Sequence, residues 1–316
     1  MAAEHDWRIR VARREDRPTI LATWNAALGG SFPLRAELLD QRLDHPRADP
    51  ELCFIADREG RACGVAVASA PGLPYPADLG HIGWLAVSPA HRGRGIGGAL
   101  LDRAETELAA RGRSLLRVGG DPAHLLPACP SGHEAWFERR GYRAGREVHD
   151  LTAPAAALPE LEALIAPAPR AGLTLRLARP GDGAALEVFF AEAFPGRWEE
   201  EILRLHADGG DVLVLTGPRG SVEGFAALYR PGAAIIGPGN FWPGAFDGPL
   251  GGLGPVGLRR ERRGGGLGLA LLAEGCRTLV DWGARHLVVD WTDLVDFYGL
   301  IGFKPWRSYR LLERAR

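Results

Sequence analysis

The sequence predicts an α/β (α+β) protein in which one domain occurs twice in tandem. Three observations support this prediction. The chain has 316 residues, about twice the usual size of a domain. Three segments of the first half recur, in the same order, in the second half. In both halves, apolar runs typical of strands alternate with amphipathic patterns typical of helices.

The recurring segments lie at nearly constant spacing. IRVARREDRPTILATWNAAL matches LRLARPGDGAALEVFFAEAF, which sets Asp16 opposite Asp182, 166 positions later. RGRGIGGALL at Arg92 matches RGGGLGLALL at Arg263, 171 positions later. RRGY matches LIGF at an offset of 161. Ordered matches of this kind indicate that a whole domain was duplicated.

A compositional break separates the two halves. The segment TAPAAALPELEALIAPAPRA is rich in alanine and proline and contains no aromatic residue. We therefore predict an N-terminal domain over 1–151, a linker over 152–171 and a C-terminal domain over 172–316.

Each predicted domain contains the same series of elements. A strand leads to an amphipathic helix, with Asp16 or Asp182 at the position of a helix cap. Two strands and an apolar strand follow, and then a glycine-rich loop opens a helix that ends at Gly112 or Gly283. A further strand, a short helix and a closing strand complete the series. The predicted strands before the closing one cover 7–11, 52–56, 63–68, 82–87 and 115–118 in the first half, and 174–177, 211–216, 222–228, 253–258 and 286–290 in the second.

Composition excludes several classes of protein. With 46% hydrophobic and 24% charged residues, the chain resembles an ordinary globular protein, and a net charge of -1 gives no basic excess to attract nucleic acid or an anionic membrane. The four cysteines show no C-x-x-C spacing, so we expect neither a metal site nor disulfides. The charged N-terminus lacks a signal peptide, and no apolar run reaches the ~18 residues of a membrane span, so we expect a cytoplasmic protein.

The two glycine-rich loops are candidate phosphate sites. Each follows an apolar strand and opens a helix, where unpaired backbone N–H groups and the helix dipole favour an anion. Glycine also serves the conformation of a strand-to-helix turn without any ligand, so one such loop is weak evidence of binding. Two specific motifs do not fit: a P-loop lysine is absent from both loops, and Leu269 replaces the third glycine of a dinucleotide fingerprint in the second. Both loops share the pattern R-x-x-G-x-G.

The stretch V-x-P-x-x-R-G-x-G-x-G, from Val87 to Gly97, resembles the GNAT superfamily of acyltransferases. The resemblance covers the chain outside the linker, although Arg260 replaces the proline in the second half. It implies two GNAT domains, each with a mixed, mostly antiparallel sheet flanked by helices. It also implies acetyl-CoA as cosubstrate, without a metal, with its pyrophosphate on the glycine-rich loop and its pantetheine arm along the preceding strand. The implied cofactor-binding residues are Leu85, Ala86, Val87, Arg92, Gly93, Arg94, Gly95, Ile96 and Gly97, and Val256, Gly257, Leu258, Arg263, Gly264, Gly265, Gly266, Leu267 and Gly268.

The resemblance also implies catalytic residues. GNAT enzymes use a backbone N–H to polarise the thioester, a base for the amine, and a tyrosine that protonates the thiolate. DFYGLIGF puts Tyr298 at the tyrosine position, whereas AWFERRGY puts Phe137 there, so we predict that the C-terminal domain is catalytic and the N-terminal domain a degenerate CoA-binding copy. Asp290 is the candidate base, although an aspartate there also suits a helix cap. His81 is a candidate base in the first copy, and Tyr298 could equally be a core aromatic.

With two GNAT-like halves, the chain resembles two groups of tandem GNAT proteins, the mycothiol synthases and the bacterial glucosamine or glucosaminide N-acetyltransferases. The function this implies is acetyl transfer from acetyl-CoA to the primary amine of a small molecule, for example an amino sugar. Other acceptors, such as an aminoglycoside or a protein N-terminus, remain open, and a non-catalytic acyl-CoA sensor is the alternative from another class. We expect a monomer or homodimer that binds neither nucleic acid nor membrane.

Overall fold

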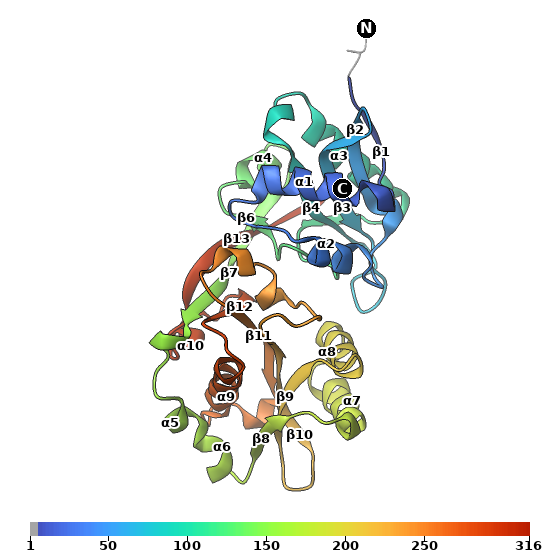
Figure 1. Ribbon diagram of the computed structural model, residues 1–316. Helices are drawn as coiled ribbons and strands as arrows, with labels where there is room; N and C mark the ends of the chain where they lie inside the picture. Colours follow the sequence, from blue (N-terminus) through green and yellow to red (C-terminus); the bar gives the residue numbers. More distant parts are fainter. Residues whose placement is uncertain (1–5) are drawn as a thin grey trace. The chain divides into compact units, whose positions relative to one another are not determined.

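The computed structural model describes residues 6–316, which form two compact units (Figure 1). The first unit comprises the described residues up to Val148 together with Ser308–Arg316, and the second comprises His149–Arg307. Each unit is a mixed sheet with helices on its faces, so the predicted fold class is confirmed.

The first unit contains a sheet in the order β1, β2, β3, β4, β5, β13. Its pairs are antiparallel except for β4 and β5, which run parallel. Its elements are β1 (Arg8–Val11), α1 (Arg17–Leu28), α2 (Ala36–Leu43), β2 (Cys53–Arg58), β3 (Arg61–Ser69), β4 (Leu79–Val87), α3 (Ile96–Ala110), β5 (Leu115–Val118), β6 (Cys129–Pro130), α4 (Glu134–Glu138), the start of β7 (Arg143–Pro154) and the end of β13 (Lys304–Ala315).

The second unit repeats this order with β8, β9, β10, β11, β12 and β7. Again one pair, β11 with β12, is parallel and the others are antiparallel. Its elements are the end of β7, α5 (Leu161–Ile165), α6 (Pro167–Arg170), β8 (Thr174–Leu177), α7 (Gly183–Ala193), α8 (Arg197–Ala207), β9 (Asp211–Thr216), β10 (Val222–Tyr229), β11 (Leu250–Leu258), α9 (Leu267–Asp281), β12 (His286–Thr292), α10 (Val295–Gly299) and the start of β13.

The closing strands differ from the expectation that each half completes itself. The end of β13, at 312–315, pairs with β5 in the first unit, and the end of β7, at 149–154, pairs with β12 in the second. The two halves of the chain therefore exchange their last strands. A duplicated domain offers the same free edge, beside β5 or β12, in both halves, so the edge itself does not select its own closing strand.

The segment predicted as a linker is folded. Residues 152–154 belong to β7, and α5 and α6 follow. Ala168 is fully buried, and Leu161, Leu164 and Ile165 pack against the core that α9 covers. Leu161, Leu164 and Ile165 share one helical face because their spacing follows the helical period.

An ion pair repeated in both units sets the entry to the first long helix. Asp16 accepts hydrogen bonds from the guanidinium of Arg10 and from the backbone N–H of Arg13, each at 2.7 Å. Asp182 accepts equivalent bonds from Arg176 and Arg179, each at 2.6 Å. Asp16 and Asp182 occupy the predicted N-cap positions of α1 and α7, but neither side chain accepts a hydrogen bond from the N–H groups of the following helix. Each instead ties the turn to the first strand.

We expect Asp182→Asn to lower stability at neutral pH. The hydrogen bond from Arg176 lowers the pKa of Asp182 to about 2, so its contribution is present above the unfolded pKa of about 3.9 and is lost as the pH falls toward 2. The expected loss at pH 7 is about 2 kcal/mol. Urea unfolding at pH 7 and pH 3 measures it, with the exposed Asp208→Asn as control; equal midpoints for wild type and Asp182→Asn at pH 7 would contradict the prediction.

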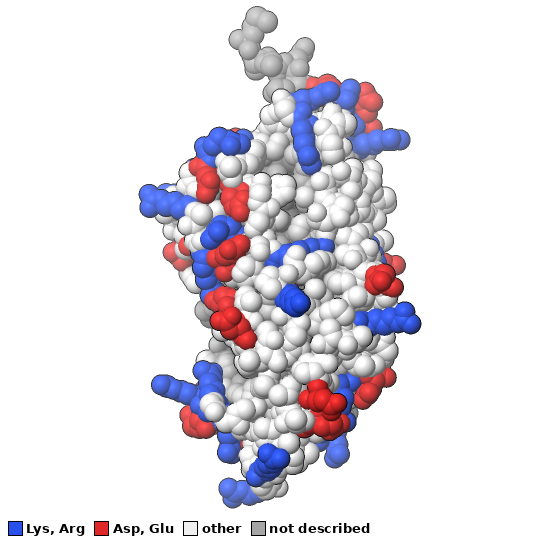
Figure 2. All heavy atoms as spheres, turned by 90° about the vertical axis from the view of Figure 1, so that its left-hand side faces the viewer, with Lys and Arg blue, Asp and Glu red and all other residues white. Residues whose placement is uncertain are grey.

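Charged side chains are mixed on the surface. On the face drawn in Figure 2, arginine and acidic side chains of the described residues intermingle, and neither sign forms a continuous patch. This agrees with the net charge of -1. None of the helices in residues 6–316 combines the length and apolar character needed to cross a membrane.

Candidate active site

The two parallel strands of the first unit, β4 and β5, separate at the point where a cavity begins. The ladder between β4 and β5 ends at Ile82 and Val118, although β4 continues to Val87. Beyond this point lies a cavity of about 600 Å³. It is lined by residues 83–87 of β4, the glycine-rich loop, the first turn of α3, and Trp136, Phe137 and Arg140 from α4 and its end. Strand, loop and helix N-terminus thus face one concave space, which suits a ligand with an anionic group.

The glycine-rich loops of the two units have the same backbone. Gly93 and Gly95 have φ angles of 75° and 82°, and Gly264 and Gly266 have 87° and 77°. These left-handed conformations favour glycine, which gives Gly95 and Gly266 of the shared R-x-x-G-x-G pattern a conformational cause, whereas Gly97 and Gly268 lie in the first turns of α3 and α9. A Cβ atom at Gly95 would meet nothing within 4 Å, which leaves the helix N-terminus approachable.

The two loop arginines are tied to the backbone. Arg92 donates to the carbonyl oxygens of Val87 and Ala27, both at 3.2 Å. Arg263 donates to the carbonyl oxygen of Leu258 at 3.4 Å. Both arginines therefore brace the strand end on which each loop begins. Their contact with a phosphate stays a prediction.

The structure brings most of the predicted cofactor residues of the first unit together. All of them line the cavity except Arg94, whose guanidinium lies 3.8 Å from a carboxylate oxygen of Asp6. Sequence reasoning missed Trp136 and Arg140, where the guanidinium lies 3.7 Å above the indole ring. Their only signal was their place beside Phe137. His81, by contrast, is fully buried, with Nδ1 3.0 Å from the carbonyl oxygen of Gly119.

In the second unit the parallel strands also part, and a carboxylate lies at that point. The ladder between β11 and β12 ends at Gly252 and Val288, although both strands continue. The short helix Pro238–Asn240 packs against the parted strands, since a Cβ atom at Gly239 would lie 2.7 Å from the carbonyl oxygen of Val288. A Cβ atom at Gly254 would lie 3.9 Å from Oδ1 of Asp290. The carboxylate of Asp290 therefore lies within van der Waals distance of this position on β11.

The surroundings of Asp290 favour its protonated form. Burial, followed by the negative charge of Asp150, raises its pKa to about 7, with Glu201 adding to the shift and Arg197 opposing it. A carboxyl group with a pKa near neutrality exchanges protons readily at physiological pH. The role of Asp290 as the base stays a prediction.

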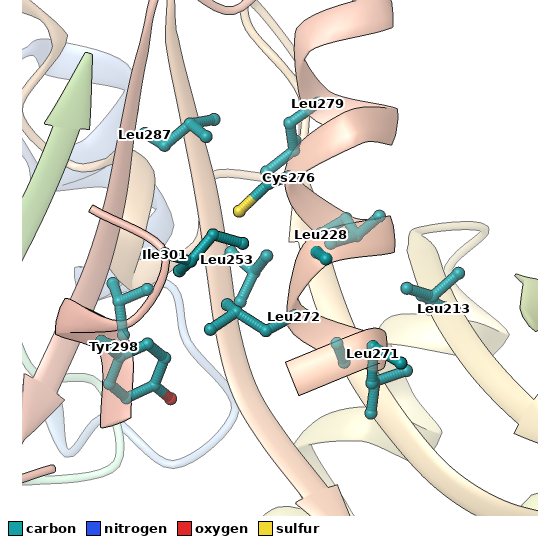
Figure 3. Close-up of a cluster of buried hydrophobic side chains, with 14 of the residues drawn as sticks. Leu213, Leu228, Leu253, Leu271, Leu272, Cys276, Leu279, Leu287, Tyr298 and Ile301 are labelled. Carbon is teal, nitrogen blue, oxygen red and sulfur yellow. The ribbon is translucent and has the colours of Figure 1, made fainter. Parts of the chain in front are cut away.

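Tyr298 lies in the hydrophobic core cluster of the second unit. It is 6% exposed and packs with Ile301, Phe303 and Leu272 among others. In Figure 3 it lies at one end of the labelled residues, with its hydroxyl directed away from Cys276. Burial, then the charge of Asp290 and the thiol of Cys276, raises the pKa of Tyr298, so the phenol stays protonated at neutral pH. Its equivalent in the first unit, Phe137, is 8% exposed and lines the cavity.

The remaining predicted residues of the second unit lie at the end of β11, in the loop that follows it and in the first turn of α9. Helix α6 packs beside their loop, since a Cβ atom at Gly266 would lie 3.4 Å from Pro167. Phe297 of α10 faces Gly268 as Trp136 of α4 faces Gly97. These residues are Val256, Gly257 and Leu258 on the strand, Arg263, Gly264, Gly265 and Gly266 in the loop, and Leu267 and Gly268 in the first turn of α9.

Sequence reasoning missed two buried carboxylates near the parting strands. Asp121 of the first unit is 2% exposed, and its Oδ1 would lie 2.7 Å from a Cβ atom at Gly83. Asp150 of the second unit is 3% exposed and lies on β7. Asp121 lies 169 positions before Asp290, so the offset of 171 between the strands does not align the two aspartates.

Comparison of the sequence with known proteins identifies the family of the chain. A sequence model of the Acetyltransferase (GNAT) family matches residues 19–128. A protein of Kineococcus radiotolerans named mycothiol acetyltransferase is 33% identical over 238 residues, which cover 71% of this chain and 69% of that relative. The chain belongs to the GNAT acetyltransferase family.

Solved structures agree on the fold of this GNAT acetyltransferase. A GCN5-related glucosamine N-acetyltransferase region of a fungal multi-domain β-N-acetylglucosaminidase has a TM-score of 0.87, at 24% identity. The match covers 99% of this chain and 38% of the fungal one. A tandem GNAT protein from the clavulanic acid biosynthesis pathway has a TM-score of 0.68 at 16% identity, with 98% of both chains covered.

GNAT acetyltransferases use acetyl-CoA. In the first unit, a cavity lies beside a glycine-rich loop whose Gly95 has open space around it. Within residues 6–316, no three His, Cys, Asp or Glu side chains are grouped as a metal ion would need. The four cysteines are buried and free.

Proposed function

We propose that this GNAT acetyltransferase moves the acetyl group of acetyl-CoA to the primary amine of a small molecule such as an amino sugar, and that the second unit performs the transfer. The carrying observation is the position of Asp290, beside Gly254 where β11 and β12 part. In the GNAT family, the thioester is expected at the strand that separates from its parallel neighbour, which is β11 in this unit. The names of the relatives, a mycothiol acetyltransferase and a glucosamine N-acetyltransferase region, support a small-molecule acceptor.

The proposed chemistry needs two proton transfers. Acetyl-CoA supplies the thioester, whose carbonyl carbon is attacked by the amine nitrogen, and the C–S bond then breaks. Asp290, with a pKa of about 7, takes the proton that the nitrogen must lose. Tyr298, kept protonated by its raised pKa, gives a proton to the sulfur. Proton transfer by such groups contributes about 10²-fold or more each.

The first unit, in this proposal, binds acetyl-CoA without turning it over. Its cavity is lined by the strand, loop and helix that the family uses for the cofactor. Phe137, which occupies the position of Tyr298, has no proton to give. A ligand bound there stabilises the folded protein in proportion to its occupancy.

The test is thiol release from acetyl-CoA over a panel of amino sugars, aminoglycosides, amino acids and peptides. We expect release with at least one amino sugar. Release only with peptides would overturn the small-molecule assignment. Release with no member of the panel would overturn the proposed acceptor class as a whole.

Matched substitutions separate the two units. Gly97→Val would crowd Trp136, since the Cβ position at Gly97 already lies 3.3 Å from its ring, and Gly268→Val would crowd Phe297. We expect each change to weaken the binding of acetyl-CoA to its own unit about tenfold or more. The reason is that the valine side chain fills the space between α3 and α4 in the first unit, or between α9 and α10 in the second. Calorimetry should show the affected site, and acetyl transfer should fall far more with Gly268→Val than with Gly97→Val. The reverse order would assign catalysis to the first unit.

A further inference from the structure

The strand pairing around Asp290 is irregular. In the ladder between β12 and β7, Val289 pairs with Leu151 and Thr292 pairs with His149. Two residues, Asp290 and Trp291, therefore stand opposite the single residue Asp150. This is a β-bulge, which bends a strand and redirects its side chains. The corresponding ladder between β5 and β13 pairs 115–118 with 312–315 and ends there, before the position equivalent to Asp290.

The bulge is held in a strained conformation. Trp291 has a φ of 44°, which is unfavourable for a bulky side chain and persists only where the surroundings impose it. Oδ1 of Asp150 accepts a hydrogen bond from the backbone N–H of Trp291 at 3.2 Å. The guanidinium of Arg197 lies 4.5 Å from the centre of the indole ring, and its Nε donates to Glu201 at 2.6 Å. The backbone bond and the stacked ring together fix the residue that follows Asp290.

We propose that Asp150 is a positioning residue for the acetyl transfer: its carboxylate holds the bulge at Trp291 and so directs the carboxylate of Asp290 toward the point where β11 and β12 part. The proposal rests on the proposed function, in which Asp290 is the base. Asp150 is carried on β7, the closing strand from the other half of the chain. The exchange of closing strands thereby supplies the second unit with a residue outside its own sequence repeat.

After burial, Asp150 is the largest influence on the pKa of Asp290. The groups that face Asp290 are Asp150 from β7, Arg197 and Glu201 from α8, and Tyr298 from α10. Of the two carboxylates, Asp150 has the larger effect, and it acts to raise the pKa of Asp290. Removing its negative charge should therefore lower that pKa, and the base should be deprotonated at a lower pH.

Two substitutions separate these effects. Asp150→Asn keeps a side-chain oxygen that can accept the Trp291 N–H but removes the charge, whereas Asp150→Ala removes both. Titration of aspartate carboxyl ¹³C signals, with Asp290 assigned from Asp290→Asn, reads the pKa without any acceptor. Asp150→Asn should lower the pKa of Asp290 by about one unit, and the lower limb of the kcat profile should move with it. The exposed Asp281→Asn on α9 is the control and should move neither.

The kinetic comparison tests the positioning. The substrates are acetyl-CoA and glucosamine, and the pH lies above the range in which kcat rises. Under these conditions Asp150→Ala should have a kcat about tenfold below that of Asp150→Asn, because the bulge is released and the base is misdirected. Equal kcat values for these two variants, or an unmoved pKa in Asp150→Asn, would overturn the proposal. If Asp290→Asn itself retains full activity, the proposed base fails instead, whatever the titration shows. Should Asp150→Ala not fold, the titration of Asp150→Asn still decides.

Discussion

Replacing Tyr298 with phenylalanine should lower kcat by about 10²-fold while leaving the protein folded. The ring packs in the cluster of Leu272, Ile301 and Phe303, and phenylalanine keeps that packing. Only the hydroxyl is lost, and with it the proton for the leaving thiolate. The KM for acetyl-CoA should change little, because the cofactor is recognised by the strand and loop. Single-turnover rates with the acceptor found in the panel measure the chemical step.

The reciprocal variant Phe137→Tyr is the matched control. It places a hydroxyl at the equivalent position of the first unit, whose ladder between β5 and β13 ends before the position equivalent to Asp290. It should give no new activity in a Tyr298→Phe background. An unchanged single-turnover rate in Tyr298→Phe would mean that another group protonates the sulfur, and the role of Tyr298 would then be packing alone.

Much of the fold could be predicted from the sequence because the duplicated domain shows the same sequence pattern in both halves. The left-handed glycines of the two loops have nearly equal φ angles, and that requirement explains why Gly95 and Gly266 recur in the shared pattern. The exchange of closing strands could not be predicted, since both halves offer equivalent edges. The folded part of the predicted linker had a signal, because Leu161, Leu164 and Ile165 recur at helical spacing, but its alanine and proline content hid it.

The site was predictable only where it lies within one repeat. The cavity residues of β4 and the loop are close in sequence, so one motif identifies them. Asp150 and Trp291 are 141 positions apart, and their hydrogen bond arises from an exchanged strand and a one-residue bulge. Neither feature has a local signature. Asp290 could be proposed from its place at the end of an apolar strand, but its raised pKa comes from burial and, next, from this distant partner.

Asp290→Asn should lower kcat by about 10²-fold or more, since the amide cannot accept a proton from the amine. In wild type, kcat should rise with pH through about 7, where the carboxyl group ionises. The residual activity of Asp290→Asn should lack this limb. Asp281→Asn, an exposed aspartate on α9, is the matched control. A variant that keeps both the rate and the limb would exclude Asp290 as the base.

The same substitution should stabilise the protein at high pH. A carboxyl group whose pKa is about 7 when folded and about 3.9 when unfolded binds more protons in the folded state. Its contribution to stability is therefore greatest below pH 3.9 and declines as the pH rises through 7. The amide introduced by Asp290→Asn carries no charge, so at pH 8 the variant should be more stable than wild type by about 2 kcal/mol, and the difference should vanish near pH 4. Urea unfolding at the two pH values measures this. If Asp290 serves catalysis, its replacement should lower activity and raise the stability of the protein. If the carboxylate instead served the fold, its replacement should lower that stability.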